Sequence, residues 1–499
     1  MINEGFRIVY HGRKYVYCFF MLCVFCSLTT LQALAQGGDY ILEAEQHWET
    51  YGVGGTCNHG GHNLFIADVD GDNVIEIIAG GFMYYVTDKT IWEAPLTIWS
   101  WNGQNVTLEK SHNWAGGIDC VYVADVDSDG TNEIITAGSF VNETGSYPSL
   151  RIWNWNNEEL SLKAHYEGVP VDSIFVSDLN KDNTPEIITV GRLGGYYENS
   201  QYTSQLCLWN VEQNNLILKE NLKLDAADVT RATSVYAFDL DTDGISEVIT
   251  GGYSGNLNSS KGQLCVWNWN GEELSLKANE NWQMVAEGYA LNIAGGVLGN
   301  TLVNNLQVGD VDGDNTPEIV TGGFAYDGEI ANAQIGIWSW SGSTLVQESS
   351  QEWSTDYITE VKCISLGDVD GNSRMEIVTG GMVAAYGSFG TNTTNPDRGQ
   401  LGVWSWDGTT LTREHMQEWT IAEGFCAWNV GTADLENDGT VEMVTVGCMS
   451  INKLCDPDMR IWSIGNAAVN PFFLPSVVAG IVAVALLSIA IFFVLKKRK

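Results

Sequence analysis

Seven short acidic segments contain the residues of this sequence that are best suited to chemistry. The first of them places oxygen-bearing side chains at positions 1, 3, 5 and 9, which are Asp68, Asp70, Asp72 and Glu76. Alternate spacing in a tight loop turns successive side chains toward one point, where a hard cation can bind several oxygens at once. We therefore take these four residues as candidate metal ligands, with the backbone carbonyl of position 7 as a fifth.

The same pattern recurs six more times, and the first aspartates of the seven copies lie 53 to 71 residues apart. We number the segments loops 1 to 7, from loop 1 (68–76) to loop 7 (434–442). The candidate ligands of loops 2 to 7 are Asp125, Asp127, Asp129 and Glu133; Asp178, Asn180, Asp182 and Glu186; Asp239, Asp241, Asp243 and Glu247; Asp310, Asp312, Asp314 and Glu318; Asp368, Asp370, Asn372 and Glu376; Asp434, Glu436, Asp438 and Glu442.

The type and number of these oxygens favour calcium over other metals. Calcium accepts six to eight oxygen ligands in flexible geometry, whereas magnesium demands a near-ideal octahedron. Zinc prefers His or Cys, and the loops contain neither. An EF-hand also begins with alternating aspartates, but it needs a closing Glu at position 12 and flanking helices. The pattern thus predicts up to seven Ca²⁺ ions, with an acidic turn that binds no metal as the alternative.

The elements around each loop read as short strands. An apolar alternating run precedes the loop, and a β-branched run such as 133–136 follows it. A third run carries tryptophan before an Asn-Gly or Asp-Gly hairpin turn, and a fourth run alternates and often ends in Trp. The leading tryptophans of the third run again number seven: Trp99, Trp153, Trp209, Trp267, Trp338, Trp404 and Trp462.

Four-strand units of this length, repeated seven times, predict an all-β fold, a seven-bladed β-propeller over residues 40–465 with a calcium loop in each blade. An open solenoid and tandem independent domains are the alternatives. The seventh unit lacks a fourth strand after Trp462, and residues 40–48 resemble the missing strand. We expect this N-terminal strand to complete the last blade and close the ring, which removes both sheet edges.

These repeats resemble the FG-GAP/VCBS family, the calcium-loop propeller repeats of the integrin α-subunit head. The resemblance covers about residues 40–465, and its most specific part is the D-x-D-x-[DN]-x-x-x-E-[IVM] loop. It implies that positions 1, 3, 5 and 9 coordinate calcium. The Phe-Gly and Gly-Ala-Pro signatures are absent, Gly322-Gly323 stands near the corresponding place, and Glu replaces the usual Asp at position 9. Integrin leg domains and an inserted ligand-binding domain are also absent, so the integrin mechanism does not transfer.

The two ends predict a single-pass membrane protein at the cell surface. Basic residues, an apolar run and the small-x-small sequence 33–35 predict a signal peptide over 1–35, with a signal anchor as the alternative. After a short linker (466–471), residues 472–495 form an uncharged segment long enough to cross a bilayer as a helix. The basic tail 496–499 places the C-terminus in the cytoplasm.

Charge and cysteine usage agree with an extracellular domain. The net charge of −38 argues against a nucleic-acid partner, which needs a basic surface. Cys448 and Cys455 are the best candidates for a disulfide, whereas Cys120 and Cys363 occupy equivalent strand positions and suit buried thiols. The sequence also contains four glycosylation sequons, at Asn105, Asn142, Asn258 and Asn392.

The function predicted from these features is binding or adhesion, with an extracellular protein or glycan as ligand. Segments of variable length, such as 82–95 and 382–399, carry aromatic side chains suited to recognition, among them Tyr253 and Tyr326. Packing of several of these side chains between blades is the alternative. A carbohydrate-active, lyase-like enzyme and a structural cell-envelope component are the alternatives. We identify no catalytic residues, and Cys57, His59 and His62 read as incidental members of a glycine-rich loop. The ligand, the oligomeric state and the remaining disulfides stay open.

Overall fold

The computed structural model describes residues 40–47, 63–81, 83–86, 90–142, 145–193, 203–225, 227, 229–256, 259–283, 291–293, 296–298, 301–326, 329–384, 397–420, 425–451 and 454–465. This part of the chain is all-β and contains no helix. Residues Leu42–Ser463 form one compact body. The predicted signal peptide, linker, membrane segment and tail lie outside the described residues, among which no helix is long and apolar enough to cross a membrane.

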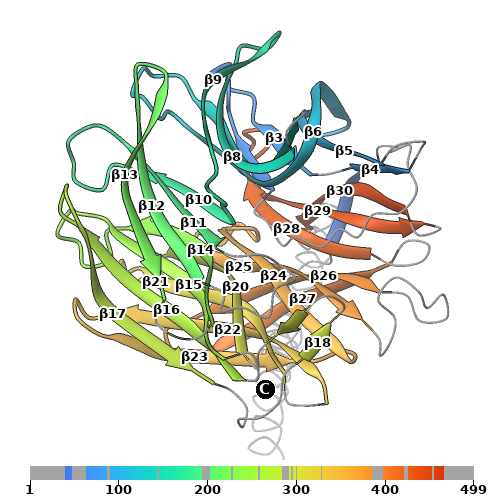
Figure 1. Ribbon diagram of the computed structural model, residues 1–499. Helices are drawn as coiled ribbons and strands as arrows, with labels where there is room; N and C mark the ends of the chain where they lie inside the picture. The colour runs from blue at the N-terminus through green and yellow to red at the C-terminus, as the bar shows by residue number, and fades with distance from the viewer. Residues whose placement is uncertain are drawn as a thin grey trace, which may run out of the picture. The chain divides into compact units, whose positions relative to one another are not determined.

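Antiparallel pairing along the chain divides the strands into seven sets, which we call repeats 1 to 7; repeats 1 and 2 share one sheet, and so do repeats 5 and 6. Figure 1 labels most of these strands. Repeat 1 contains β2 (Leu64–Ala67), β3 (Glu76–Gly80), β4 (Met83–Val86), β5 (Thr90–Trp101) and the first part of β6 (Val106–Ala124). Repeat 2 contains the rest of β6, β7 (Glu133–Asn142), β8 (Gly145–Trp155) and β9 (Leu160–Glu167). Repeat 3 contains β10 (Ser173–Ser177), β11 (Glu186–Leu193), β12 (Thr203–Glu212) and β13 (Asn215–Leu224).

The later repeats have the same plan. Repeat 4 contains β14 (Val229–Phe238), β15 (Glu247–Asn256), β16 (Ser259–Trp269) and β17 (Leu274–Trp282), and a small hairpin of β18 (Leu291–Ile293) and β19 (Gly296–Leu298) follows. Repeat 5 contains β20 (Thr301–Gly309), β21 (Glu318–Tyr326), β22 (Ala331–Trp340) and β23 (Leu345–Trp353). Repeat 6 contains β24 (Ile358–Gly367), β25 (Glu376–Ala384), β26 (Arg398–Trp406) and β27 (Leu411–Trp419). Repeat 7 contains β28 (Phe425–Ala433), β29 (Glu442–Ile451), β30 (Leu454–Ile464) and, beside β30, β1 (Tyr40–His47).

The boundary between repeats 1 and 2 differs from the prediction made from the sequence. Four separate strands were expected in each repeat, but the fourth strand of repeat 1 and the first strand of repeat 2 run together as β6. Residues 106–115 of β6 pair with β5, and residues 116–124 pair with β7.

The second strand of a repeat is deeply buried, and its composition follows from that position. All nine residues of β21 are buried, so the strand reads as a continuous run of apolar and small residues rather than an alternating one. A Cβ added at Gly323 would lie 1.9 Å from the carbonyl oxygen of Leu302, and one at Gly322 would lie 2.6 Å from Ile364 Cδ1. The Gly-Gly pair is therefore required by the close approach of two first strands, one from its own repeat and one from the next.

Aromatic pairs between third and fourth strands join consecutive repeats. The last aromatic residue of one fourth strand packs on the leading tryptophan of the next third strand, as Trp282 does on Trp338, with ring centroids 4.6 Å apart. The equivalent pairs are Trp114–Trp153, Tyr166–Trp209, Trp353–Trp404 and Trp419–Trp462, with centroids 4.6 to 5.1 Å apart. Such pairs bury large apolar areas and fix the packing of neighbouring sheets.

Repeat 7 packs against repeat 1. Trp99 and Trp101 of repeat 1 share a hydrophobic cluster with Val444 and Ile461 of repeat 7. Asn437 in loop 7 also donates a hydrogen bond to the carbonyl oxygen of Asn73 in loop 1, at 3.1 Å. The first strands of all seven repeats line one cavity of about 270 Å³.

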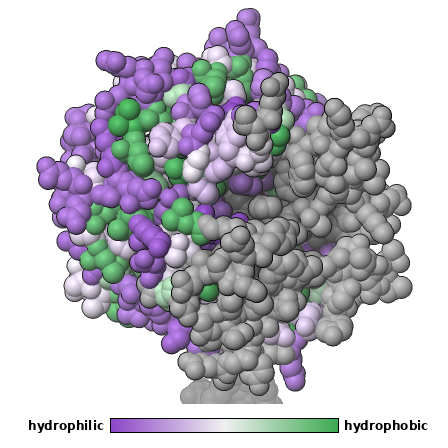
Figure 2. All heavy atoms as spheres, viewed as in Figure 1, coloured by the Kyte–Doolittle hydropathy of each residue, from purple (hydrophilic) through white to green (hydrophobic). Residues whose placement is uncertain are grey.

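The cysteines and the surface complete the description. Cys120, Cys207, Cys265 and Cys363 are buried, as expected for Cys120 and Cys363, and burial raises the pKa of Cys363 to about 11. The side chains of Cys448 and Cys455 lie outside the described residues. On the face drawn in Figure 2, hydrophilic residues predominate among the described ones, and apolar residues lie in small separate groups.

Candidate metal centres

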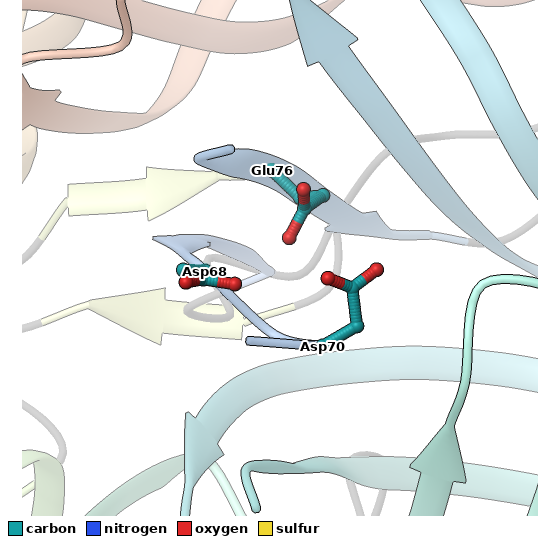
Figure 3. Close-up of side chains that lie close together, drawn as sticks. All are labelled: Asp68, Asp70 and Glu76. Carbon is teal, nitrogen blue, oxygen red and sulfur yellow. The ribbon is translucent and has the colours of Figure 1, made fainter. Parts of the chain in front are cut away.

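Each acidic loop connects the first strand of a repeat to the second. In loop 1, Asp68 and Asp70 follow β2, and Glu76 is the first residue of β3. The three carboxylates converge, with one oxygen of each lying within 4.8 Å of the others (Figure 3). Strand pairing fixes this geometry because Ala67 and Glu76 are direct partners across the hairpin.

The same three positions come together in at least five of the seven loops. Besides loop 1, the groups are Asp125, Asp127 and Glu133; Asp239, Asp241 and Glu247; Asp310, Asp312 and Glu318; Asp368, Asp370 and Glu376. The fifth position is placed differently, since one oxygen of this side chain accepts a hydrogen bond from the backbone N–H of position 7. This bond is present in every loop and is formed by Asp72, Asp129, Asp182, Asp243, Asp314, Asn372 and Asp438.

The glutamate at position 9 is held by its own loop. One of its oxygens accepts the backbone N–H of position 2, at 3.1 Å between Val311 N and Glu318 Oε2 in loop 5. The other loops have the same bond at 2.9 to 3.1 Å, accepted by Glu76, Glu133, Glu186, Glu247, Glu376 and Glu442. Loops 3 and 7 thus share the architecture of the other five. The second oxygen also accepts a hydrogen bond in three loops, from Lys163 Nζ to Glu133 at 2.7 Å, from Asn210 Nδ2 to Glu186 at 3.3 Å and from Asn372 Nδ2 to Glu376 at 3.1 Å.

Left-handed backbone lets each loop wrap around its aspartate at position 1. In loop 5, Gly313 and Asn315 have φ of 78° and 70°, which only Gly adopts freely and Asn tolerates best. Asn315 N donates to Asp310 Oδ2 at 2.9 Å, and the corresponding bond occurs in all seven loops. The alternation of acidic residues with Gly, Asn and Ser follows from this geometry.

Several carboxylate oxygens in the loops are buried without a hydrogen-bond donor. Asp239 Oδ1 and Asp368 Oδ1 are examples. A buried acceptor that lacks a donor costs free energy, and an ion bound between the carboxylates would remove that cost. The donor set therefore fits a hard divalent cation, and positions 1, 3 and 9 are the residues that would hold it.

The pKa values of the glutamates reflect the same crowding. Burial, followed by the charge of nearby aspartates, raises the pKa of Glu76 to about 8 and that of Glu318 to about 7. The pKa values of Glu247, Glu376 and Glu442 are also raised to about 7, chiefly by burial. A cation in the loop would favour the ionised carboxylates and offset this effect.

In loops 5 and 7, the side chain at position 3 lies against a neighbouring repeat. A Cβ added at Gly408, in the β26–β27 turn of repeat 6, would lie 2.8 Å from Asp312 Oδ2 in loop 5. Similarly, one at Gly103 in repeat 1 would lie 2.9 Å from Glu436 Oε1 in loop 7. The candidate sites therefore stand at the boundaries between repeats, where an ion would stabilise both.

One contact was not anticipated from the sequence, and for two tyrosines the alternative of interior packing holds. Lys163 Nζ lies among the carboxylates of loop 2. Lys163 is the bulge residue of β9, and the bulge is known only from the strand pairing. Tyr253 and Tyr326, expected to contribute to an aromatic binding face, are 8% and 9% exposed and belong to one hydrophobic cluster. They pack in the interior instead, while Cys57, His59 and His62 lie outside the described residues.

Comparisons with known proteins add no family to this description. No protein-family model matches the chain, and no curated protein matches it in sequence.

Proposed function

We propose that the chain forms a closed seven-bladed β-propeller of the FG-GAP/VCBS type, whose loops bind up to seven calcium ions. The cavity lined by the first strands of all seven repeats supports this arrangement, because radial repetition brings the innermost strands around one axis. The pairing of β1 with β30 and the contact of loop 7 with loop 1 are consistent with closure.

The observation that carries the metal assignment is the repeated set of contacts within the loops. Seven loops hold the position-9 glutamate against the backbone of position 2, and at least five converge three carboxylates on one point. Calcium suits the oxygen-only donor set and the flexible loop geometry. The ions would neutralise the crowded carboxylates and hold neighbouring repeats together.

On this scaffold we propose a binding or adhesion function at the cell surface, with an extracellular protein or glycan as partner. The predicted signal peptide and C-terminal membrane helix would place the propeller outside the cell, next to the lipid. Calcium would act as a structural ion that keeps the connecting loops rigid for recognition. Binding of the partner would then depend on extracellular calcium, although no ion contacts the partner.

Thermal denaturation with and without a calcium chelator tests the structural role of the ions. We expect chelation to lower the melting temperature, with calcium restoring it and magnesium restoring less. Binding to a glycan array and to proximity-labelled surface proteins should be lost under the same chelation. An unchanged melting temperature in excess chelator would contradict the proposal.

A further inference from the structure

Loop 2 already contains a cation of its own. Lys163 Nζ lies 2.6 Å from Asp127 Oδ2, 2.7 Å from Glu133 Oε1 and 3.8 Å from Asp129 Oδ2. The Lys163 side chain is 5% exposed, and that of Glu133 is 1% exposed. The two shorter distances are those of charge-assisted hydrogen bonds. The ammonium thus binds the same oxygens, at positions 3 and 9, that a metal ion would take in the other loops.

Lys163 reaches the loop because it stands at a β-bulge. Ile152 pairs with Ala164 and Trp153 with Leu162, so Lys163 has no partner residue in β8. A bulge residue is re-aimed relative to its neighbours, and here the side chain turns toward loop 2. The same bulge recurs in the fourth strand of the other repeats for which the register is defined, where the residues are Glu109, Lys219, Lys277, Glu348 and Glu414.

The charge of this bulge residue divides the repeats into two groups. Repeats 2, 3 and 4 carry Lys there, whereas repeats 1, 5 and 6 carry Glu. In repeats 5 and 6 the glutamate accepts a hydrogen bond from the serine between the two tryptophans of the third strand, at 2.6 Å for Ser339–Glu348 and for Ser405–Glu414. The residue equivalent to this serine is Asn154 in repeat 2. In repeat 2 the positive charge of the bulge residue reaches the loop carboxylates, whereas in repeats 5 and 6 the negative bulge residue bonds to the third strand.

We propose that Lys163 is the resident cation of loop 2, so that this loop keeps its carboxylates together without a divalent ion. Loops whose repeat has Glu at the bulge depend on a bound ion instead. This inference rests on the proposed calcium function of the other loops. A divalent ion can enter loop 2 only by displacing an ammonium from two short ion pairs, which lowers the affinity of that loop relative to loop 5.

Lys219 provides a matched control. It occupies the equivalent bulge in repeat 3, but its Nζ pairs with Glu212 of β12 at 2.5 Å rather than with loop 3. Replacing Lys219 with Gln removes the same charge from the equivalent position but leaves the contacts of the loop 3 carboxylates unchanged. Any difference between the two variants then reports the contact of Lys163 with loop 2.

The test counts calcium ions bound per full-length chain by equilibrium dialysis, for the wild type, Lys163→Gln and Lys219→Gln. Lys163→Gln is expected to bind one more ion than the wild type, and Lys219→Gln the same number. In excess chelator Lys163→Gln should melt at a lower temperature than the wild type, and calcium should restore it. An unchanged ion count together with an unchanged melting temperature in chelator overturns the inference.

Two ligand variants keep the inference testable if Lys163→Gln does not fold. Asp312→Asn in loop 5 should lower the ion count by one, whereas Asp127→Asn in loop 2 should leave it unchanged. Equal losses in both variants would show that loop 2 binds calcium like loop 5, which overturns the inference but leaves the proposed function intact. Absence of calcium binding in the wild type and in all variants would overturn both.

Discussion

Replacing Glu318 with Gln should change the stability of the protein in opposite directions with and without calcium. Glu318 is 6% exposed, and one of its oxygens accepts the N–H of Val311 at 3.1 Å. The amide oxygen of Gln can accept the same bond, so the substitution preserves the shape of loop 5. It also removes the negative charge of Glu318, which the negative charges of Asp312 and Asp314 repel.

The size of the effect follows from the pKa of Glu318. Burial raises this pKa from 4.5 to about 7, so the ionised carboxylate is less favourable in the folded chain than in the unfolded one. Below the unfolded pKa both states are protonated and nothing is lost, and stability falls as the pH rises from 4.5 to about 7. Above that pH the difference corresponds to about 3 kcal/mol. In chelator at about pH 8, Glu318→Gln should therefore be more stable than the wild type by up to this amount.

In saturating calcium the order should reverse. The variant loses one anionic ligand of loop 5, and an ion present at a hundred times its dissociation constant contributes about 2.7 kcal/mol to stability. Urea denaturation in chelator and in calcium, at about pH 8 and about pH 4, measures both terms. Glu272→Gln, in an exposed turn, is the control and should change nothing. A variant that is equally destabilised in chelator and in calcium would refute the reasoning, because Glu318 would then act only as a structural hydrogen-bond acceptor.

Three further predictions concern the scaffold and the ions. Thr321→Val leaves the buried indole N–H of Trp338 without its acceptor, now 3.1 Å away, and should cost about 1–3 kcal/mol in urea denaturation; the exposed Thr412→Val should cost little, and equal losses would contradict this assignment. Deleting residues 40–47 removes the ion pair of Glu45 with Arg460 and exposes the edge of β30. The cooperative melting transition of the protein should therefore be lost, and unchanged melting would contradict closure of the ring. Calcium binding at pH 7 should release protons, because the ions favour the ionised form of glutamates whose pKa values are about 7. Calorimetry in two buffers of different ionisation enthalpy measures this release, and binding heats that do not depend on the buffer would contradict it.

The sequence predicts much of the fold because the strands and the acidic loop of each repeat are specified by residues within that repeat. The seven acidic loops and the seven leading tryptophans define the sets of strands, and the resemblance of residues 40–48 to a fourth strand anticipates the pairing of β1 with β30. Positions 1, 3 and 9 of a loop converge because the two flanking strands are paired next to them. Such features depend on contacts close in the chain.

The remaining features depend on contacts between repeats. The continuity of β6 across a repeat boundary has no sequence signal of its own. Lys163 reads as one more charged residue on an alternating strand until the bulge in its pairing is known. Similarly, Tyr253 and Tyr326 stand at the ends of second strands and read as loop aromatics, but they share a hydrophobic cluster with Ile358 and Met382 of repeat 6.

A crystal structure of the protein grown in calcium, with the anomalous signal of the ion, tests the central claim most directly. We predict an ion in loop 5 between Asp310, Asp312 and Glu318, with oxygen distances of about 2.3–2.6 Å, and equivalent ions in loops 1 and 6. Loops that stay without an ion in millimolar calcium, with their carboxylates arranged as they are now, would contradict it.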